Sequence, residues 1–516
     1  MIIKELIKNR VKTSADLNTV KRKMAKKLNI STLSNAELLK AYHNLVENKR
    51  LKINKNLEAI LRKRKIRSLS GIVVVSVLTK PYPCPGKCLY CPSQKGIPKS
   101  YLKKEPAVMR AILNKFNPYL QFQNRIRALK ENGHPVDKID LRIIGGTWSF
   151  YPKSYQTRFI KRCFEAANRQ KTNSLKKAQK ANEKAKHKII GITIETRPDF
   201  INKKEIKRLR ELGVTRVELG IQSIYDNVLK LNKRGHSVTD TIKATQLLKD
   251  AGFKICYQVM PNLPGSNLKL DKKMFRELFQ NPDFQPDLLK IYPCAVLKEA
   301  PLYKKWRKGE YFPYKEKDLK NLIKEIKKGI PYYVRIQRII RDIPSFYIPA
   351  GPAKVSNLRQ IIAEESKKEN WKCRCIRCRE VGADYKPKEK LYLYRQNYDA
   401  SKGKEIFLSY ESKKRDRLYS LLRLRIPSQK EHCIPALQDA AIIREVHTYG
   451  QMIPVGEKTI APQHRGLGKK LIKEAEKIAK KEFGLNKMAV ISGIGVRNYY
   501  RKLGYKLKDT YLAKKT

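Results

Sequence analysis

Short β-branched runs alternate with amphipathic helical segments along the middle of the chain. The runs have the character of buried strands, and between them the apolar positions return at helical spacing. The predicted strands are Ile72–Leu78, Ile139–Ile144, Ile189–Glu195, Arg216–Ile221, Lys254–Met260 and Leu288–Tyr292, and the predicted helices include Gln156–Arg169, Lys203–Leu212, Thr239–Ala251 and Lys273–Phe279. This alternation predicts a parallel α/β sheet or barrel with functional residues at the carboxyl ends of its strands.

Further regions flank this repeating unit, which occupies residues 66–345. Residues 1–65 carry basic and apolar side chains at helical spacing, which predicts a basic, amphipathic helical region. A Pro/Gly-rich stretch ends the repeat, and residues 346–403 form a linker. Residues 404–516 predict a smaller α/β domain, with strands at Ile406–Ser409, Ser420–Arg425, Ala440–Val446 and Lys487–Ile491 and a long helix at Lys469–Phe483.

The net charge of the chain indicates what kind of partner it binds. The 516 residues include 114 lysines and arginines against 47 aspartates and glutamates, a formal net charge of +67. A chain this basic repels itself unless a polyanion neutralises it, which indicates a nucleic-acid partner. Its longest apolar run, Gly71–Leu78, is too short to span a bilayer, and the charged start lacks a signal core. We therefore expect a cytoplasmic protein without membrane contact.

A cysteine triad follows the first predicted strand. Cys84, Cys88 and Cys91 lie in a proline-rich loop that cannot be helical, so their thiolates can surround one centre. Three ligands at this spacing suit three irons of a [4Fe–4S] cluster and leave the fourth iron open; a zinc ion would need a fourth ligand, which the nearby sequence lacks. An open iron beside a barrel mouth is what reductive cleavage of S-adenosylmethionine requires.

Residues at later strand ends complete the predicted S-adenosylmethionine site. Gly145, Gly146 and Thr147 follow a predicted strand, and glycine lets a ligand approach the main chain closely. Glu195 and Gln222 each end a later strand, where they would hold the amine, ribose or adenine. An ordinary turn at the two glycines, and capping by the two polar residues, are the alternatives.

A glycine loop opens the long helix of the last domain. Backbone N–H groups at such a helix start converge on one point, where the helix dipole favours a pyrophosphate. The loop matches neither a dinucleotide-binding fingerprint nor a P-loop. Its pattern Q-x-x-G-x-G resembles the acetyl-CoA loop of the GNAT acyltransferase superfamily, and NYYRKLGY (498–505) strengthens the resemblance. The predicted acetyl-CoA-binding residues are Gln463, His464, Arg465, Gly466, Leu467, Gly468 and Lys469.

A second cysteine cluster lies between the two large lobes. Cys373, Cys375 and Cys378 place three thiols within a short CRCIRC segment. A structural zinc needs four ligands, and His432 and Cys433, both distant in the chain, are the candidates for the fourth. Unligated reduced cysteines are the alternative to this zinc site.

These features together resemble the family of Elongator catalytic subunits, tRNA wobble-uridine modifying enzymes, in their stand-alone archaeal or bacterial form. The resemblance covers nearly the whole chain from about residue 65 onward, in segments that include GGTWSFYP (145–152), GITIETRPD (191–199), NKRGHSV (232–238) and IIREVHTYG (442–450). It implies a radical-SAM partial βα barrel followed by a GNAT-like α/β domain. It also implies that the basic amino-terminal region binds tRNA and that the anticodon stem-loop is the substrate.

The chemistry implied by the resemblance explains why two such different sites share one chain. Carbon 5 of uridine bears no leaving group and the acetyl methyl is only weakly acidic, so joining them requires a radical. A 5′-deoxyadenosyl radical would take hydrogen from the acetyl methyl; addition to uridine and thioester hydrolysis would leave 5-carboxymethyluridine. The candidate catalytic residues are Lys290, Glu445, His447, Tyr499 and Tyr500, with Tyr292 as a further substrate contact.

Three other functions stay open at this point. A GNAT protein lysine acetyltransferase would use the glycine loop but leave the cysteine triad without a role. A non-catalytic RNA-binding scaffold would explain only the charge. A radical methylthiotransferase would need a second iron–sulfur cluster, for which CRCIRC is a poor candidate. A homodimer or a larger complex is compatible with the sequence.

Overall fold

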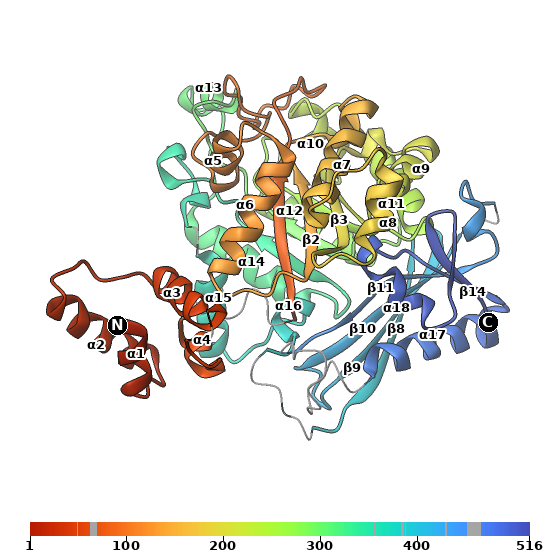
Figure 1. Ribbon diagram of the computed structural model, residues 1–516. Coiled ribbons are helices and arrows are strands. Elements are labelled where there is room, and N and C mark those ends of the chain that lie inside the picture. The colour runs from red at the N-terminus through yellow and green to blue at the C-terminus, as the bar shows by residue number, and fades with distance from the viewer. Residues whose placement is uncertain are drawn as a thin grey trace.

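The computed structural model has a small helical lobe, a barrel-like lobe and a carboxyl-terminal sheet lobe (Figure 1). It describes residues 1–48, 50–61, 70–355, 357–382, 386, 389–428, 431–450 and 466–516.

Seven parallel strands form the barrel-like lobe, and they pair in chain order. The described residues show no pairing between β1 and β7, so the sheet is an open partial barrel, which confirms the predicted architecture. The strands are β1 (Ile72–Leu78), β2 (Lys138–Ile144), β3 (Lys188–Thr196), β4 (Arg216–Gln222), β5 (Lys254–Val259), β6 (Leu288–Ile291) and β7 (Arg335–Ile339).

Helices cover the outer face of this sheet (Figure 1). Strand alternation explains the arrangement, because Val73, Val75 and Val77 of β1 are buried in the core while Val74 and Ser76 point the other way and keep contact with solvent. The helices between the strands are α5 (Pro106–Leu113), α6 (Pro118–Glu131), α7 (Lys153–Asn168), α8 (Leu175–Asn182), α9 (Lys203–Glu211), α10 (Asp226–Leu231), α11 (Val238–Asp250), α12 (Leu268–Gln280), α13 (Leu302–Arg307) and α14 (Glu316–Gly329).

The carboxyl-terminal lobe is a second, mixed sheet with the order β13-β14-β12-β11-β10-β9-β8. Its only parallel pair among the described strands is β11 with β12, and the chain between them includes α17 (Leu467–Phe483). This helix buries Leu471, Ile472 and Ile478 against the sheet. The strands are β8 (Tyr392–Ala400), β9 (Gly403–Glu411), β10 (Leu418–Ile426), β11 (Ala441–Thr448), β12 (Lys487–Val490), β13 (Lys506–Lys508) and β14 (Tyr511–Lys515).

The amino-terminal lobe consists of α1 (Ile2–Lys8), α2 (Ser14–Lys27), α3 (Asn35–Glu47) and α4 (Lys55–Leu61). Capping boxes start α2 and α3, and the four helices share a small apolar core of their own. The lobe lies beside the barrel at the red end of the chain in Figure 1. None of the helices described here combines the length and apolar character needed to cross a membrane.

The base of the barrel packs against the second sheet through buried charges. Asp287, one residue before β6, forms an ion pair with Arg444 of β11, and Arg444 also pairs with Glu405 of β9 at 3.0 Å. Asp250 at the end of α11 pairs with Arg425 of β10 at 2.7 Å. Because these contacts use residues near the strand starts, the carboxyl ends of the barrel strands open on the opposite side.

Candidate functional site

The cysteine triad lies in the loop that follows β1, at the open mouth of the barrel. Backbone hydrogen bonds hold this loop on both sides: Leu89 N donates to Asn232 O at 3.2 Å, and Leu302 N donates to Leu89 O at 2.8 Å. Cys88 is buried, whereas Cys84 and Cys91 are partly exposed. A cavity of about 450 Å³ adjoins the loop and is lined by Pro81, Tyr82, Pro83, Cys84, Gly86, Ser93, Ile97 and Lys99.

The three sulfurs of this loop are not arranged as ligands of one ion would be. Sulfurs bound to one zinc ion at about 2.3 Å lie at most about 4.6 Å apart. Cys84, Cys88 and Cys91 do not form a group within 4.8 Å; among the described residues that criterion selects only the other cysteine cluster. The three thiols of this loop therefore do not show the close convergence of ligands around a single ion.

The protonation of Cys91 bears on how this loop binds a metal cluster. Burial raises the pKa of Cys91 to about 12, and the neighbouring Cys88 and Cys84 add to the shift, whereas Lys99 and Arg341 oppose it. A thiol with this pKa stays protonated at neutral pH. Cluster binding must therefore displace a proton from Cys91.

The Gly145-Gly146 segment follows β2, and the packing around its first position requires glycine. Gly145 has φ +138°, and a Cβ there would lie 1.8 Å from Thr79 Oγ1. That threonine hydroxyl is within 2.8 Å of the Tyr151 hydroxyl, which locks the ends of β1 and β2 together. Gly146 has φ +102°, and its added Cβ would meet only the carbonyl oxygen of Lys99 at 3.6 Å, beside the cavity wall. Thr147 precedes the short 3-10 helix η2 (Trp148–Phe150).

Charged side chains from β3, β4 and β6 meet at the mouth. Lys290 pairs with Glu218 and lies 3.5 Å from Glu195, which accepts a 3.0 Å hydrogen bond from Tyr101. Burial raises the pKa of Glu195 although the charge of Lys290 opposes this. Burial alone would lower the pKa of Lys290, but Glu218, Tyr292 and Glu195 raise it overall. Lys290 therefore remains a cation at the end of β6.

The structure adds Arg341 to the barrel mouth, a residue that the sequence did not single out, and it places the predicted Gln222 beside Gly220. Arg341, just after β7, donates to Ser100 Oγ and to Glu105 at 3.0 Å each, and its guanidinium stacks 4.8 Å from the centre of the Tyr101 ring. Gln222 ends β4 with φ +67°, and its amide turns back over Gly220. A local signal for Arg341 existed only as the basic segment RIIRDIPS, because β7 itself was not predicted.

The start of α17 forms a second candidate site. Gly466 caps the helix with φ +67°, Leu467 begins it, and Lys469 is exposed in the first turn. A Cβ on Gly468 would lie 3.2 Å from the Tyr499 hydroxyl, so this hydroxyl lies directly over that turn. Tyr500 instead packs in the apolar core of the lobe. Gln463, His464 and Arg465 lie outside the described residues.

Glu445 and His447 face the barrel, away from α17. The register between β10 and β11 shifts at Arg444, a bulge that lets Arg444 and Glu445 both contact the other lobe. Glu445 pairs with Arg423 at 2.9 Å and Lys254 at 3.2 Å. The His447 ring lies 4.2 Å from that of Tyr449, and burial lowers the pKa of His447 to about 4. The structure thus separates these two residues from Tyr499.

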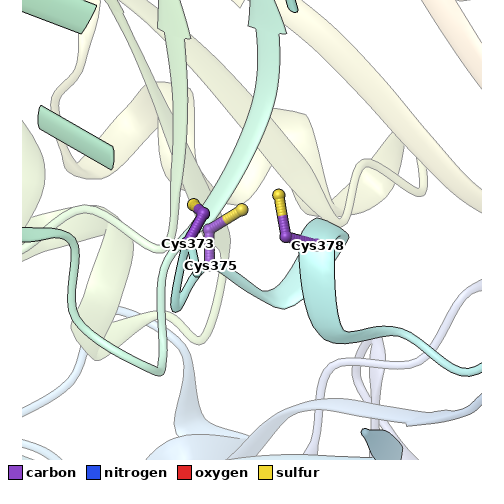
Figure 2. Close-up of side chains that lie close together, drawn as sticks. All are labelled: Cys373, Cys375 and Cys378. Atoms are coloured by element: carbon purple, nitrogen blue, oxygen red, sulfur yellow. The ribbon is translucent and has the colours of Figure 1, made fainter. Parts of the chain in front are cut away.

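The second cysteine cluster converges, as Figure 2 shows, with Cys378 on the short helix α16 (Ile376–Arg379). The sulfurs of Cys373, Cys375 and Cys378 all lie within 4.8 Å of one another, as ligands of one ion do. The structure does not bring the two candidate fourth ligands to this group. Cys433 lies near the lysines of α9, and His432 near Asp250 and Asp439.

Comparison with known proteins places this site in a wider context. The radical SAM superfamily profile matches residues 82–278, and the Radical_SAM C-terminal domain profile matches residues 286–368. The chain is 48% identical over 502 residues to a tRNA uridine(34) acetyltransferase of Methanocaldococcus infernus, covering 95% of this chain and 92% of that protein. It is 38% identical over 531 residues to Elongator complex protein 3 of Homo sapiens, covering 99% and 96% of the two chains.

A solved structure supports the same relationship. The archaeal Methanocaldococcus infernus Elp3 with an N-terminus deletion (1-46) superposes with a TM-score of 0.77 at 45% sequence identity. The match covers 86% of this chain and 99% of that one. Both lobes around the candidate sites therefore have a counterpart of known structure.

Proposed function

The chain belongs to the radical-SAM family that includes the tRNA uridine(34) acetyltransferases and Elongator complex protein 3, and on that premise we propose that it modifies the wobble uridine of tRNA. The proposed product is 5-carboxymethyluridine, and the proposed small-molecule substrates are acetyl-CoA and S-adenosylmethionine. The juxtaposition that carries the proposal is the cysteine loop beside an open cavity and a charged barrel mouth, in one chain with a glycine-capped helix start.

The barrel mouth is suited to a radical SAM site. Cys84, Cys88 and Cys91 would hold the [4Fe–4S] cluster, which when bound supplies the electron for reductive cleavage of S-adenosylmethionine. Gly146 lies beside Lys99 of the cavity lining and Thr147 follows it, so the main chain of this segment would bind the methionine moiety. Gly145 contributes by closing β2 on Thr79, and Glu195 and Gln222 offer polar groups at the neighbouring strand ends.

Lys290 is the strongest candidate for a substrate contact among the charged residues of the mouth. Its pairing with Glu218 keeps the ammonium charged and fixed, while Glu195 is shared with Tyr101. A fixed ammonium donates hydrogen bonds to a carbonyl oxygen, either of uracil or of the thioester. Its effect is to orient the reacting group at the strand ends.

The helix start in the carboxyl-terminal lobe is suited to acetyl-CoA. The first backbone N–H groups of α17 after Gly466 would bind a pyrophosphate at the helix start, and the long helix adds its dipole. The Tyr499 hydroxyl over Gly468 can donate a hydrogen bond to the thioester. This arrangement resembles the GNAT acyltransferases. Glu445 and His447 then serve the contact between the lobes, beside the base of the barrel.

Two features support tRNA as the partner. The net charge of +67 favours a polyanion, and the amino-terminal helices form a separate basic lobe beside the barrel. Phe346 in the 3-10 helix η4 (Ser345–Tyr347), shortly after β7, is 65% exposed, and Lys104 Nζ lies 5.0 Å from its ring centre. An exposed ring with a cation beside it offers a stacking surface to an unpaired anticodon base.

Cys373, Cys375 and Cys378 would hold a structural zinc ion. The thiols of Cys373 and Cys378 donate to Cys375 and lower its pKa, so it is the first of the three to supply a thiolate. The segment is tied to the barrel edge, since Ile376 N donates to Val334 O at 2.9 Å. The ion would stabilise the connection between the lobes. Reduced cysteines and a tRNA substrate fit the cytoplasm, where we place the protein.

Nucleoside mass spectrometry tests the proposed function. The protein, reconstituted with iron and sulfide without oxygen, is incubated with tRNA, acetyl-CoA, S-adenosylmethionine and a reductant. We expect 5-carboxymethyluridine at position 34 with the wild type and none with Cys88→Ser. Product formation by Cys88→Ser, or acetylated lysine with no change in the tRNA, would reject the proposal.

A further inference from the structure

Arg234 is a buried cation beside the cysteine loop. Only 8% of it is exposed, and it lies in the loop that follows α10. Its Nη1 donates to Cys88 Sγ at 3.5 Å and its Nη2 donates to the carbonyl oxygen of Gly220 at 2.5 Å. The loop also supports the cysteine segment, because Asn232 O accepts the backbone hydrogen bond from Leu89.

Among the described residues, no carboxylate forms an ion pair with Arg234. Burying a guanidinium costs free energy unless negative charge faces it. The Arg234 guanidinium instead contacts Cys88 Sγ directly. Negative charge at the cysteine site would therefore balance the charge of Arg234.

A neighbouring arginine provides the contrast. The Arg197 guanidinium also reaches the cysteine loop, since a Cβ on Gly86 would lie 2.9 Å from its Nη1. Arg197, however, pairs with Asp199 at 2.8 Å and donates to Gly235 O at 2.9 Å. Its charge is already balanced within the protein, so its effect on the cysteine site is weaker than that of Arg234.

We infer that Arg234 is a positioning residue that raises the reduction potential of the iron–sulfur cluster held by Cys84, Cys88 and Cys91. The inference rests on the cluster proposed above. Reduction by one electron adds one negative charge to the cluster, and Arg234 stabilises that charge through its own charge and its bond to Cys88 Sγ. Net charge and hydrogen bonds to the sulfurs are the levers by which a protein sets such potentials.

Gly220 fixes the distance between Arg234 and the cluster site. A Cβ at this glycine would lie 2.8 Å from Arg234 Nη2 and 2.9 Å from Gln222 Nε2. Gly220→Ala must therefore displace the guanidinium while it keeps the charge in the chain. This variant complements Arg234→Met, which removes the charge, and Arg234→Lys, which keeps the charge but loses the forked donor.

A redox titration of the reconstituted protein tests the inference. Dithionite supplies the electrons through mediators, and the reduced cluster is followed by electron paramagnetic resonance, without tRNA, acetyl-CoA or S-adenosylmethionine. We expect at least a tenfold lower ratio of reduced to oxidised cluster in Arg234→Met at a fixed potential, which is 59 mV for a one-electron couple. Arg234→Lys and Gly220→Ala should shift less in the same direction, and Arg197→Met less than Arg234→Met.

Two results would overturn the inference. One is a wild-type midpoint potential in Arg234→Met at equal iron content; the other is an equal shift in Arg197→Met. If Arg234→Met does not take up iron, wild-type potentials in both Arg234→Lys and Gly220→Ala overturn it. A wild-type protein that binds the cluster but does not modify uridine contradicts the proposed function alone. A wild-type protein that binds no cluster contradicts both the proposed function and this inference.

Discussion

The buried ion pairs between the lobes make a quantitative prediction about Arg444. Its guanidinium pairs with Asp287 and Glu405, and all three side chains are almost completely removed from solvent. Arg444→Met leaves these two carboxylates with Lys249, Arg423 and Arg425 as their remaining cations, at 3.5 to 3.9 Å. Removing one partner of a buried pair costs about 3–5 kcal/mol, and here both carboxylates lose their shortest cation contact while they stay buried.

Urea unfolding followed by circular dichroism measures this cost, with Arg395→Met as the matched control. Arg395 forms a forked pair with Glu482 at 2.6 Å on the partly exposed surface, where such pairs contribute about 0.2–1 kcal/mol. Arg444→Met combined with Asp287→Asn should recover part of the loss, since the second change neutralises a buried carboxylate that has lost its shortest ion pair. A cost for Arg444→Met no larger than that of the control would refute the reasoning.

Three further predictions follow from single sites. Burial lowers the pKa of His447 from 6.5 to about 4, so unfolding takes up a proton between pH 6.5 and pH 4. The free energy of unfolding should therefore fall by up to about 3 kcal/mol over this range, and His447→Gln should flatten that fall in urea titrations at each pH. An unchanged slope in the variant would contradict this role of His447. Phe346→Ala should weaken tRNA binding by about 1–3 kcal/mol in filter binding, whereas Leu113→Ala on the exposed face of α5 should leave it unchanged. Equal effects of the two substitutions would contradict a stacking role for Phe346. Cys375→Ser should abolish copurified zinc by elemental analysis while Cys433→Ser retains it, and zinc in both variants would contradict the triad.

Strands rich in buried apolar residues could be predicted from the sequence, whereas strands that carry many polar residues could not. The predicted strand Ile72–Leu78 coincides with β1, in which the buried Val73, Val75 and Val77 alternate with the less buried Val74 and Ser76. β7 was missed because RIQRI carries two arginines and a glutamine, and the pairing of Arg335 with Glu380 at 2.7 Å is not a local property of the sequence. β8 was missed because it is an edge strand whose polar side chains stay in contact with solvent.

Some parts of the candidate sites could be predicted from the local sequence, and others depend on the fold. The cysteine loop and the glycine-capped start of α17 could be predicted, since proline, glycine and thiol spacing act over a few residues. The direction of Glu445 depends on a bulge in β11 and on which lobe covers each sheet face, and neither is a local property. Arg234 lies 146 residues from Cys88 in sequence, so only the closed fold brings them together.

If one chain joins the acetyl methyl to the wobble uridine through radical chemistry, a deuterium atom of that methyl must pass to 5′-deoxyadenosine. The wild-type protein is given acetyl-CoA with a fully deuterated methyl group, together with S-adenosylmethionine, reductant and tRNA. The account predicts 5-carboxymethyluridine at position 34 with two deuterium atoms, and the third in 5′-deoxyadenosine. Undeuterated 5′-deoxyadenosine alongside a labelled nucleoside, or label recovered only in acetylated lysine, would contradict it.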